Sequence, residues 1–173
     1  MKNIKTPISD RLKEIRTYHD YKQVEIAKKL GIINTMYCDW ELNRRLIPLK
    51  YLNELSNFYN ISIDYLLGLT NKTKSIKHKD IDMDIIAQRL KEIRKDYNLT
   101  VTEFASSLNS CKTTFTNYEN KIRLIQTSFC YDIARTYNIS VDWLLGKSNE
   151  KIIWKTSIFC ISYKLKKKKI NMF

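Results

Sequence analysis

The side chains in this sequence that could catalyse a reaction or hold a metal do not gather into a recognisable set. His19 and His78 stand alone, and no Ser/His/Asp or Cys/His arrangement can be argued. The sequence also lacks a glycine-rich loop of the kind that cradles phosphate. Its 4 cysteines form no close pair, so they are expected to be reduced thiols and not a disulfide framework or zinc site. We therefore predict no catalytic residue, no metal, no cofactor and no enzymatic activity.

Positive charge is the strongest chemical signal in the chain. The sequence has 31 lysines and arginines against 18 aspartates and glutamates, a formal net charge of +13. Such an excess favours a polyanionic partner, either nucleic acid or an anionic membrane surface. Residues 149–173, which contain the lysine-rich run 164–169, carry about +6 of this charge.

Two stretches, Leu30–Arg45 and Leu108–Arg123, lie 78 positions apart and align without a gap. Each combines hydrogen-bonding side chains with arginine at its end. By our count about 23 of roughly 63 aligned positions are identical, which indicates an internal duplication. Two further segments recur at the same spacing: Arg-Leu-Lys-Glu-Ile-Arg at 11–16 and 89–94, and Ile-Ser-x-Asp-x-Leu-Leu-Gly at 61–68 and 139–146.

Each copy has the apolar spacing of short helices. In the first copy we expect helices that end at about Tyr18, that span 23–30, 34–42 and 49–59, and that run from Ser62 to Leu66-Leu67-Gly68. Ile8, Leu12 and Ile15 recur at i, i+4 and i+7, so they are predicted to face the core. Tyr37 and Trp40 are three positions apart and are predicted to point inward from the third helix.

The second copy keeps the positions that shape the backbone. Gly31 is predicted to need a positive φ between the second and third helices, and Asn109, the usual substitute, stands at its counterpart. Thr100 and Glu103 have the spacing of a capping box. Asp64 lies in the first turn of the last helix, where a negative charge suits the helix dipole. The same fold is therefore expected twice.

A polar segment, residues 71–85, separates the copies and is predicted to be a flexible linker whose ends lie on the order of 20 Å apart. The expected domains are 1–70 and 86–148, followed by a basic tail, 149–173, to which we assign no fold. The apolar part of the tail is too short to span a bilayer, and no signal peptide opens the chain. We therefore expect a cytoplasmic protein without a transmembrane segment.

The helix order, the alanine in the second helix, the glycine at the turn, Trp-Glu-x-Asn after the third helix and the closing Ser-x-Asp-x-Leu-Leu-Gly form one pattern. In these features residues 8–70 and 86–148 resemble the Cro/C1-type helix-turn-helix domain of the XRE family. The resemblance implies an all-α protein with two tandem five-helix, lambda-repressor-like bundles. It also implies a sequence-specific transcriptional regulator of double-stranded DNA, with repression as the expected direction.

The resemblance implies which residues contact bases, because the first residues of the third helix meet base edges in this family. Carried over by position, these are Asn34, Thr35, Met36 and Asp39 in the first copy and Lys112, Thr113, Thr114 and Asn117 in the second. Asparagine can pair with adenine, lysine can donate to guanine, and threonine or methionine can touch a thymine methyl. Asp39 also has a structural interpretation as a partner of Arg44, since a carboxylate repels phosphates.

The resemblance further implies phosphate contacts from Gln23, Arg44, Arg45, Thr100 and Arg123. Gln23 matches the glutamine with which the family holds phosphate at the start of the second helix. The second copy has Val101 there, so the Thr100 hydroxyl or backbone N–H groups would take over the contact. Arg45 and Arg123 share one frame position after the third helix, where a cation suits a phosphate.

Two features of the resemblance concern structure. A glutamate at the end of the third helix is expected to pair with an arginine of the first helix: Glu41 with Arg16, and Glu119 with Arg94. The family's glycine two residues after this glutamate is Asn43 in the first copy and Lys121 in the second. Because lysine tolerates a positive φ less well than asparagine, the second copy's turn is expected to be altered.

Two alternatives stand beside the DNA-binding hypothesis. In the first, one copy is a protein or peptide interaction or dimerisation module, and Val101 and Lys121 make the second copy the better candidate. In the second, the tail 149–173 contacts anionic lipid. A basic tail that strengthens non-specific DNA contact is preferred over membrane contact. Dimerisation with a second copy of the chain stays open.

Overall fold

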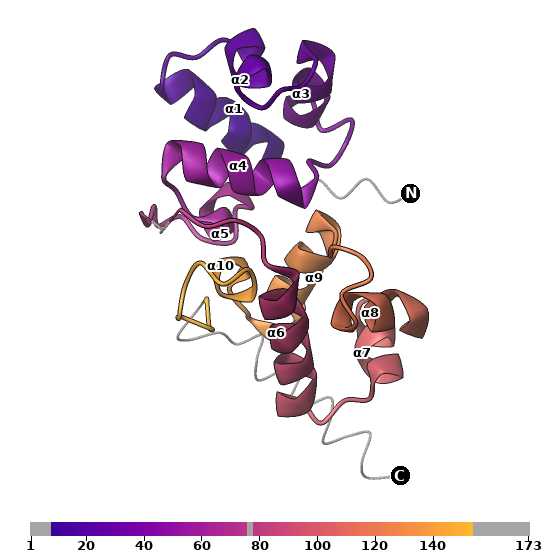
Figure 1. Cartoon of the computed structure of the whole chain (residues 1–173). Helices are drawn as coiled ribbons and strands as arrows, with labels where there is room; N and C mark the ends of the chain where they lie inside the picture. The colour runs from indigo at the N-terminus through magenta and orange to yellow at the C-terminus, as the bar shows by residue number, and fades with distance from the viewer. Residues whose placement is uncertain (1–7, 76–77, 154–173) are drawn as a thin grey trace.

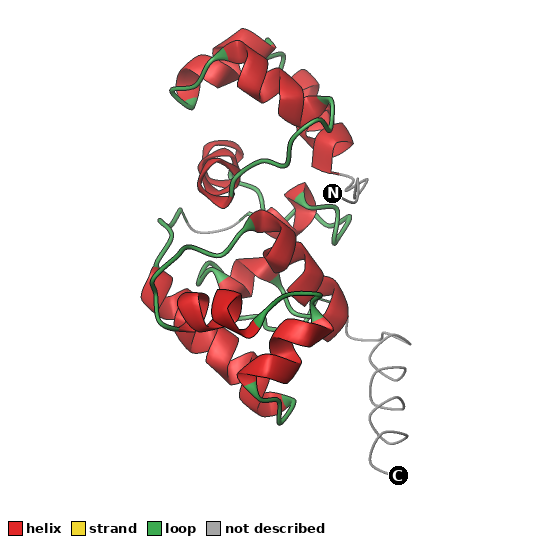
Figure 2. Ribbon diagram, turned by 90° about the vertical axis from the view of Figure 1, so that its right-hand side faces the viewer, coloured by secondary structure: helices red, strands yellow, loops and turns green. Residues whose placement is uncertain are grey.

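The computed structural model of the protein describes residues 8–75 and 78–153, and within these ranges its regular elements are helices apart from an isolated bridge between Ile139 and Ile152 (Figure 1, Figure 2). The first domain comprises α1 Ile8–Tyr18, α2 Gln23–Lys29, α3 Asn34–Glu41, α4 Leu49–Tyr59 and α5 Ile63–Leu66. The second comprises α6 Met83–Asp96, α7 Val101–Ser107, α8 Lys112–Glu119, α9 Thr127–Tyr137 and α10 Val141–Leu144. The expected all-α fold with two tandem helix-turn-helix bundles is confirmed.

The two domains repeat each other along the chain. Helices α7 to α10 begin and end 78 positions after α2 to α5. Helix α6 begins within the expected linker, because the Asp82 side chain caps it by accepting from the backbone N–H groups of Asp84 and Ile85 at 2.8 and 3.4 Å. Met83, Asp84 and Ile85 are therefore helical, although they fall in the expected linker 71–85.

Residues with a left-handed backbone conformation end several helices, as the sequence predicts for Gly31 and Asn109. Gly31 has φ 63° and its counterpart Asn109 has φ 52°. A Cβ at Gly31 would meet no atom within 4 Å, so this position needs glycine or asparagine for its backbone angle and not for space. Asn60 and Asn138 end α4 and α9 in the same conformation, with φ 53° and 58°.

The turn after α8 corrects one expectation. Lys121 has φ 61° and Asn43 has φ 54°, so the turn is the same in both copies and is not altered by lysine. Backbone hydrogen bonds hold it, since Ile122 N donates to Asn117 O at 2.8 Å. The Lys121 ammonium also reaches Asp84 Oδ1 at 2.6 Å. Tertiary constraints thus outweigh the intrinsic preference of lysine.

Each helix contributes a buried apolar side chain to the centre of its domain. The central residues are Leu12, Ile26, Tyr37, Leu52 and Ile63 in the first domain and Leu90, Phe104, Phe115, Cys130 and Val141 in the second. Each aliphatic or aromatic side chain buried in this way contributes roughly 1.5–3 kcal/mol. Ala27 and Ala105 are also buried, and their small size allows α2 and α7 to approach α3 and α8 closely.

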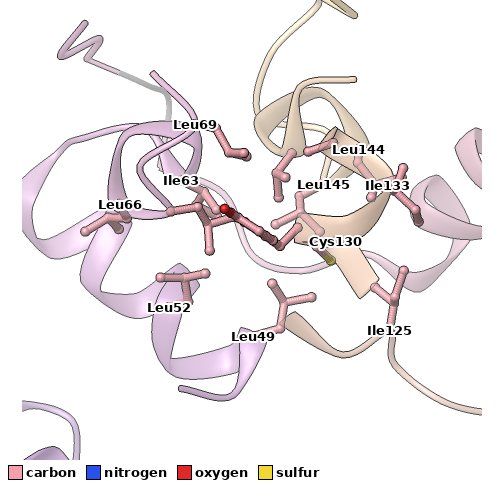
Figure 3. Packing of buried hydrophobic residues seen from close by; sticks show 14 of the residues in the cluster. Leu49, Leu52, Ile63, Leu66, Leu69, Ile125, Cys130, Ile133, Leu144 and Leu145 are labelled. Carbon is pink, nitrogen blue, oxygen red and sulfur yellow. The ribbon is translucent and has the colours of Figure 1, made fainter. Parts of the chain in front are cut away.

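The hydrophobic cores of the two domains merge where α4 and α5 meet α9 and α10. Figure 3 shows Leu49, Leu52 and Ile63 on one side of this junction and Cys130 and Leu145 on the other. The buried apolar residues form one cluster that runs through both domains. The two bundles are therefore packed against each other and are not independent domains joined only by a linker.

Part of the expected linker is bound to the first domain. The Lys79 carbonyl oxygen accepts from the side-chain amides of Asn53 and Asn57 at 3.0 and 3.3 Å. The Lys79 ammonium donates to the carbonyl of Gly146 at 3.2 Å, in the second domain. This residue therefore joins both domains, unlike the freely extending chain that the polar composition predicted.

The start of the expected tail lies against the second domain. Ser140 N donates to the carbonyl of Lys151 at 2.8 Å, and the Lys151 ammonium pairs with Glu92 and Asp96 at 2.5 Å each. The rest of the tail, 154–173, with its lysine run, lies outside the described residues. Within the part of the chain that the structure describes, no helix has the length and apolar character to cross a membrane.

Candidate nucleic-acid interface

Helices α2 and α3 form the helix-turn-helix unit of the first domain, and α7 and α8 form that of the second. Ile32 N donates to the carbonyl of Ala27 at 3.0 Å, which closes the turn after α2. Ser110 N makes the equivalent bond to Ala105 at 2.9 Å. Helices α3 and α8 lie on the same, right-hand side of the molecule in Figure 1, and Figure 2 views the molecule from that side.

The predicted base-contacting residues occupy equivalent places in both copies. Asn34 and Thr35 are exposed at the start of α3, and Lys112 and Thr113 are exposed at the start of α8. The other predicted base-contacting residues lie further along each helix and are half-buried: Met36 and Asp39 in α3, and Thr114 and Asn117 in α8. The structure therefore brings these side chains to two exposed helix ends, one in each domain.

The predicted phosphate ligands Arg44 and Arg45 flank Asp39. Their side-chain nitrogens lie 3.5 and 3.7 Å from its carboxylate oxygens, and both arginine side chains are largely exposed. Exposed pairs of this kind contribute ~0.2–1 kcal/mol, so a phosphate can replace the carboxylate at little cost. These contacts agree with the structural interpretation of Asp39, whose base contact stays a prediction.

Gln23 belongs to a buried network at the start of α2. Arg16 donates from Nε and Nη2 to the Glu41 carboxylate at 2.6 and 2.9 Å, and Gln23 Nε2 donates to Glu41 Oε2 at 2.8 Å. Burial would raise the pKa of Glu41, but these hydrogen bonds hold the pKa below its ordinary value. The expected Glu41–Arg16 pair is confirmed. The Gln23 amide keeps a second N–H that can donate to a phosphate.

The second domain repeats the ion pair but not the glutamine. Arg94 donates from Nε and Nη2 to the carboxylate of Glu119 at 2.8 and 3.1 Å, so this expected pair is also confirmed. Val101 replaces Gln23 and makes no such bond to Glu119. The Arg94–Glu119 ion pair therefore orients α8 without a side-chain donor at the position of Gln23.

The predicted capping box of α7 is confirmed. Thr100 Oγ1 accepts from Glu103 N at 3.2 Å and donates to Glu103 Oε2 at 2.8 Å, while Thr100 N donates to the same oxygen at 2.7 Å. The Thr100 hydroxyl hydrogen is therefore engaged within the protein. Its predicted phosphate contact requires exchange of this bond. Arg123 is exposed after α8, at the frame position of Arg45.

An exposed isoleucine adjoins the predicted base-contacting residues and was not among them. Ile33 is the N-cap residue of α3 and is 68% exposed. N-cap positions usually hold Ser, Thr, Asp or Asn, so an apolar residue here is the signal that could have revealed it. Ile33 places an apolar surface beside Asn34, where a thymine methyl or a sugar could be contacted.

Two family models and several known regulators are similar to parts of this chain. A family model described as helix-turn-helix matches residues 12–66, and one described as helix-turn-helix domain matches residues 87–150. ImmR, an HTH-type transcriptional regulator of Bacillus subtilis (strain 168), is 35% identical over 92 residues, which are 53% of this chain and 72% of ImmR. The chain belongs to the Cro/C1-type helix-turn-helix family.

Two further relatives of this helix-turn-helix protein come from the same bacterium. YonR, an SPbeta prophage-derived uncharacterized HTH-type transcriptional regulator, is 33% identical over 94 residues, which are 54% of this chain and 81% of YonR. YobD, an uncharacterized HTH-type transcriptional regulator, is 36% identical over 61 residues, so the chain spans about half of it, 54%. No solved structure is significantly similar to the chain. The family is non-enzymatic, in agreement with the sequence-based expectation.

Proposed function

We propose that this helix-turn-helix protein is a sequence-specific DNA-binding transcriptional repressor. In this proposal it reads the major groove with the leading ends of α3 and α8. The observation that carries the proposal is the exposure of Asn34 and Thr35, and of Lys112 and Thr113, at helix ends on one side of the molecule. An α-helix fits the major groove of B-DNA, where each base pair presents a distinct pattern of donors and acceptors. We also propose a cytoplasmic location, which follows from DNA as the partner.

The two reading ends differ in chemistry, so the proposed target is asymmetric. The first presents Asn34, Thr35 and Met36, whereas the second presents Lys112 and two threonines. Two domains on one face would reach half-sites about one helical turn, or ~34 Å, apart. The proposed operator therefore has two different half-sites at a fixed spacing.

Phosphate contacts would supply a large part of the affinity. The predicted phosphate ligands lie before or after the reading helices in the sequence: Gln23, Arg44 and Arg45 near α3, and Arg123 after α8. Each neutralised phosphate is expected to add about 0.9 to the slope of log K against log salt. Arg45→Ala and Arg123→Ala should each lower this slope by about one. Lys72→Ala, at an exposed position after α5 and outside both helix-turn-helix units, is the matched control and should leave the slope unchanged.

A second candidate function makes α7 and α8 a protein-interaction surface. Val101 at the position of Gln23 favours it, together with the engagement of the Thr100 hydroxyl in the capping box. Titration of one DNA duplex with two variants of the full chain distinguishes the two functions. DNA reading by both domains predicts that Lys112→Ala/Thr113→Ala weakens binding as Asn34→Ala/Thr35→Ala does. An unchanged affinity in the Lys112→Ala/Thr113→Ala variant would favour the interaction module.

A further inference from the structure

The contact between α5 and α10 is reciprocal. Asp142 Oδ1 and Oδ2 accept from the backbone N–H groups of Ile63 and Asp64 at 2.8 and 3.0 Å. Asp64 Oδ1 and Oδ2 accept from Val141 N at 2.7 Å and from Ser140 Oγ at 2.6 Å. Asp142 is the counterpart of Asp64 in the duplicated frame. Each domain therefore offers the same surface to the other, as two subunits do across a two-fold axis.

Away from this axis the two halves of the contact differ. On one side the Lys147 ammonium donates to Asn53 Oδ1 and Asn57 Oδ1 at 2.6 Å each and to Ser56 Oγ at 3.3 Å. Lys147 is only 7% exposed, so its charge depends on these three acceptors of α4, together with the nearby carboxylates of Asp142 and Asp80. A lysine of the second domain is thus buried in a polar recess of the first.

On the other side of the axis the lysine is replaced by leucine. Leu69 is the counterpart of Lys147 and is buried, and Figure 3 shows it at the junction with Leu144 and Leu145. The counterparts of the three acceptors are Tyr131, Ala134 and Arg135. These residues offer no amide or carboxylate oxygen to an ammonium group, so this half of the contact suits leucine and not lysine.

Pairing of like domains would mismatch both halves. Two second domains would bury Lys147 against the positions of Tyr131, Ala134 and Arg135. The one side-chain acceptor there is the Tyr131 hydroxyl, which already accepts from Arg135 at 3.3 Å, so the ammonium group would lie beside a guanidinium group in place of its three acceptors. Two first domains would set Leu69 against Asn53, Ser56 and Asn57, whose polar groups would lose their lysine donor. The pairing of unlike domains alone matches lysine with acceptors and leucine with an apolar surface.

We propose that Lys147 and its acceptors on α4, with Leu69 on the opposite side, restrict this surface to pairing of unlike domains. The connecting residue Lys79, which bonds to Asn53 in the first domain and to Gly146 in the second, holds that pair within one chain. The protein is then a monomer in which the first domain pairs with the second domain of the same chain. As a consequence that rests on the proposed function, one chain covers both half-sites of an operator in a fixed order.

Sedimentation of the full chain without DNA tests the pairing rule. Wild-type protein is expected to stay at the monomer mass of 20.7 kDa over a wide concentration range. Lys147→Leu makes the second domain compatible with itself, and Leu69→Lys does the same for the first. Each variant should therefore form dimers as concentration rises. Lys72→Leu, an exposed control, should stay monomeric.

The double variant Lys147→Leu/Leu69→Lys gives the sharpest result. Its unlike pair is mismatched on both sides, whereas both like pairs are matched on both sides. Its dimer dissociation constant should be lower than that of either single variant by about tenfold or more. A double variant that keeps its helical circular dichroism and remains a monomer would overturn the proposal, as would a wild-type dimer.

The mass of the wild-type complex with DNA gives a check that needs no variant. Native mass spectrometry is expected to find one chain per bound duplex, and two chains per duplex would overturn the proposal. Failure of the protein to bind any duplex would instead count against the proposed function. The sedimentation result for the free chain would then still decide whether the pairing rule holds.

Discussion

At the scale of single residues, Asn34 and Lys112 hold the same place in their helices but differ in hydrogen-bonding capacity. An amide both donates and accepts, as adenine requires, whereas an ammonium group only donates, as guanine requires. Asn34→Ala should cost about 1–3 kcal/mol of discrimination at one base pair of the first half-site. Fluorescence anisotropy on duplexes with single base changes measures this loss. An equal loss on every duplex would contradict a base contact by Asn34.

Glu41 is the residue on which the first helix-turn-helix unit depends most. Its carboxylate is bound by Arg16 and Gln23, and its side chain is only 2% exposed. Glu41→Gln leaves the Arg16 charge without its partner and should destabilise the protein by roughly 3 kcal/mol. Chemical denaturation measures the change. Glu54→Gln, which removes the exposed pair with Lys50, is the control and should cost less than about 0.5 kcal/mol.

At the scale of elements, the sequence predicted most helices to within about one residue because their signals are local. Thr100 and Glu103 cap α7 from three positions apart, and Gly31 and Asn109 set their own backbone angles. The start of α6 was missed, because Asp82 was assigned to a polar linker by composition. Its role as a cap depends on the helix that follows it.

Lys121 shows where local preference fails to predict a turn. Its positive φ of 61° is imposed by the end of α8 and by the core behind it, not by the residue type. Lys121→Gly removes this backbone strain, at the cost of flexibility in the unfolded chain and of an exposed contact with Asp84. The thermal midpoint should rise by about 1–2 °C. Asn43→Gly should raise it less, and a fall in the Lys121→Gly midpoint would show that the turn is unstrained.

At the scale of the whole molecule, the contacts between domains could not be predicted from the sequence. Asp64 was expected to complement the dipole of its own short helix, but it accepts hydrogen bonds from Ser140 and Val141 of the second domain. Lys147 was assigned no role, although it stands where the first copy has a leucine. Such roles arise from the docking of two distant segments, which no spacing within one copy records.

The buried carboxylates of Asp64 and Asp142 should make stability depend on pH. Burial and the nearby Asp142 charge raise the pKa of Asp64 to about 8. Because this pKa is raised above the unfolded value, the stabilisation is fully present below about pH 4 and is lost as pH rises through about 8. Denaturation midpoints should therefore fall from mildly acidic pH to about pH 8.

Another buried group, Lys147, limits the pH range in which the contribution of Asp64 to stability can be measured. Burial lowers the pKa of Lys147 to about 8, so the loss of its proton favours the folded state as pH rises above about 8. The comparison is therefore best made below that pH. Asp64→Asn should remove most of the slope there, and the exposed control Asp10→Asn should keep it. An unchanged slope in Asp64→Asn would assign the pH dependence to other groups.

We propose that α3 and α8 read two different DNA half-sites from one rigid molecule. Selection of bound duplexes from a random DNA pool by the full chain tests it most directly. We expect two unlike motifs at one fixed spacing of about a helical turn, and we expect Asn34→Ala/Thr35→Ala to erase only the first motif. A selected pool without any enriched sequence would contradict the account.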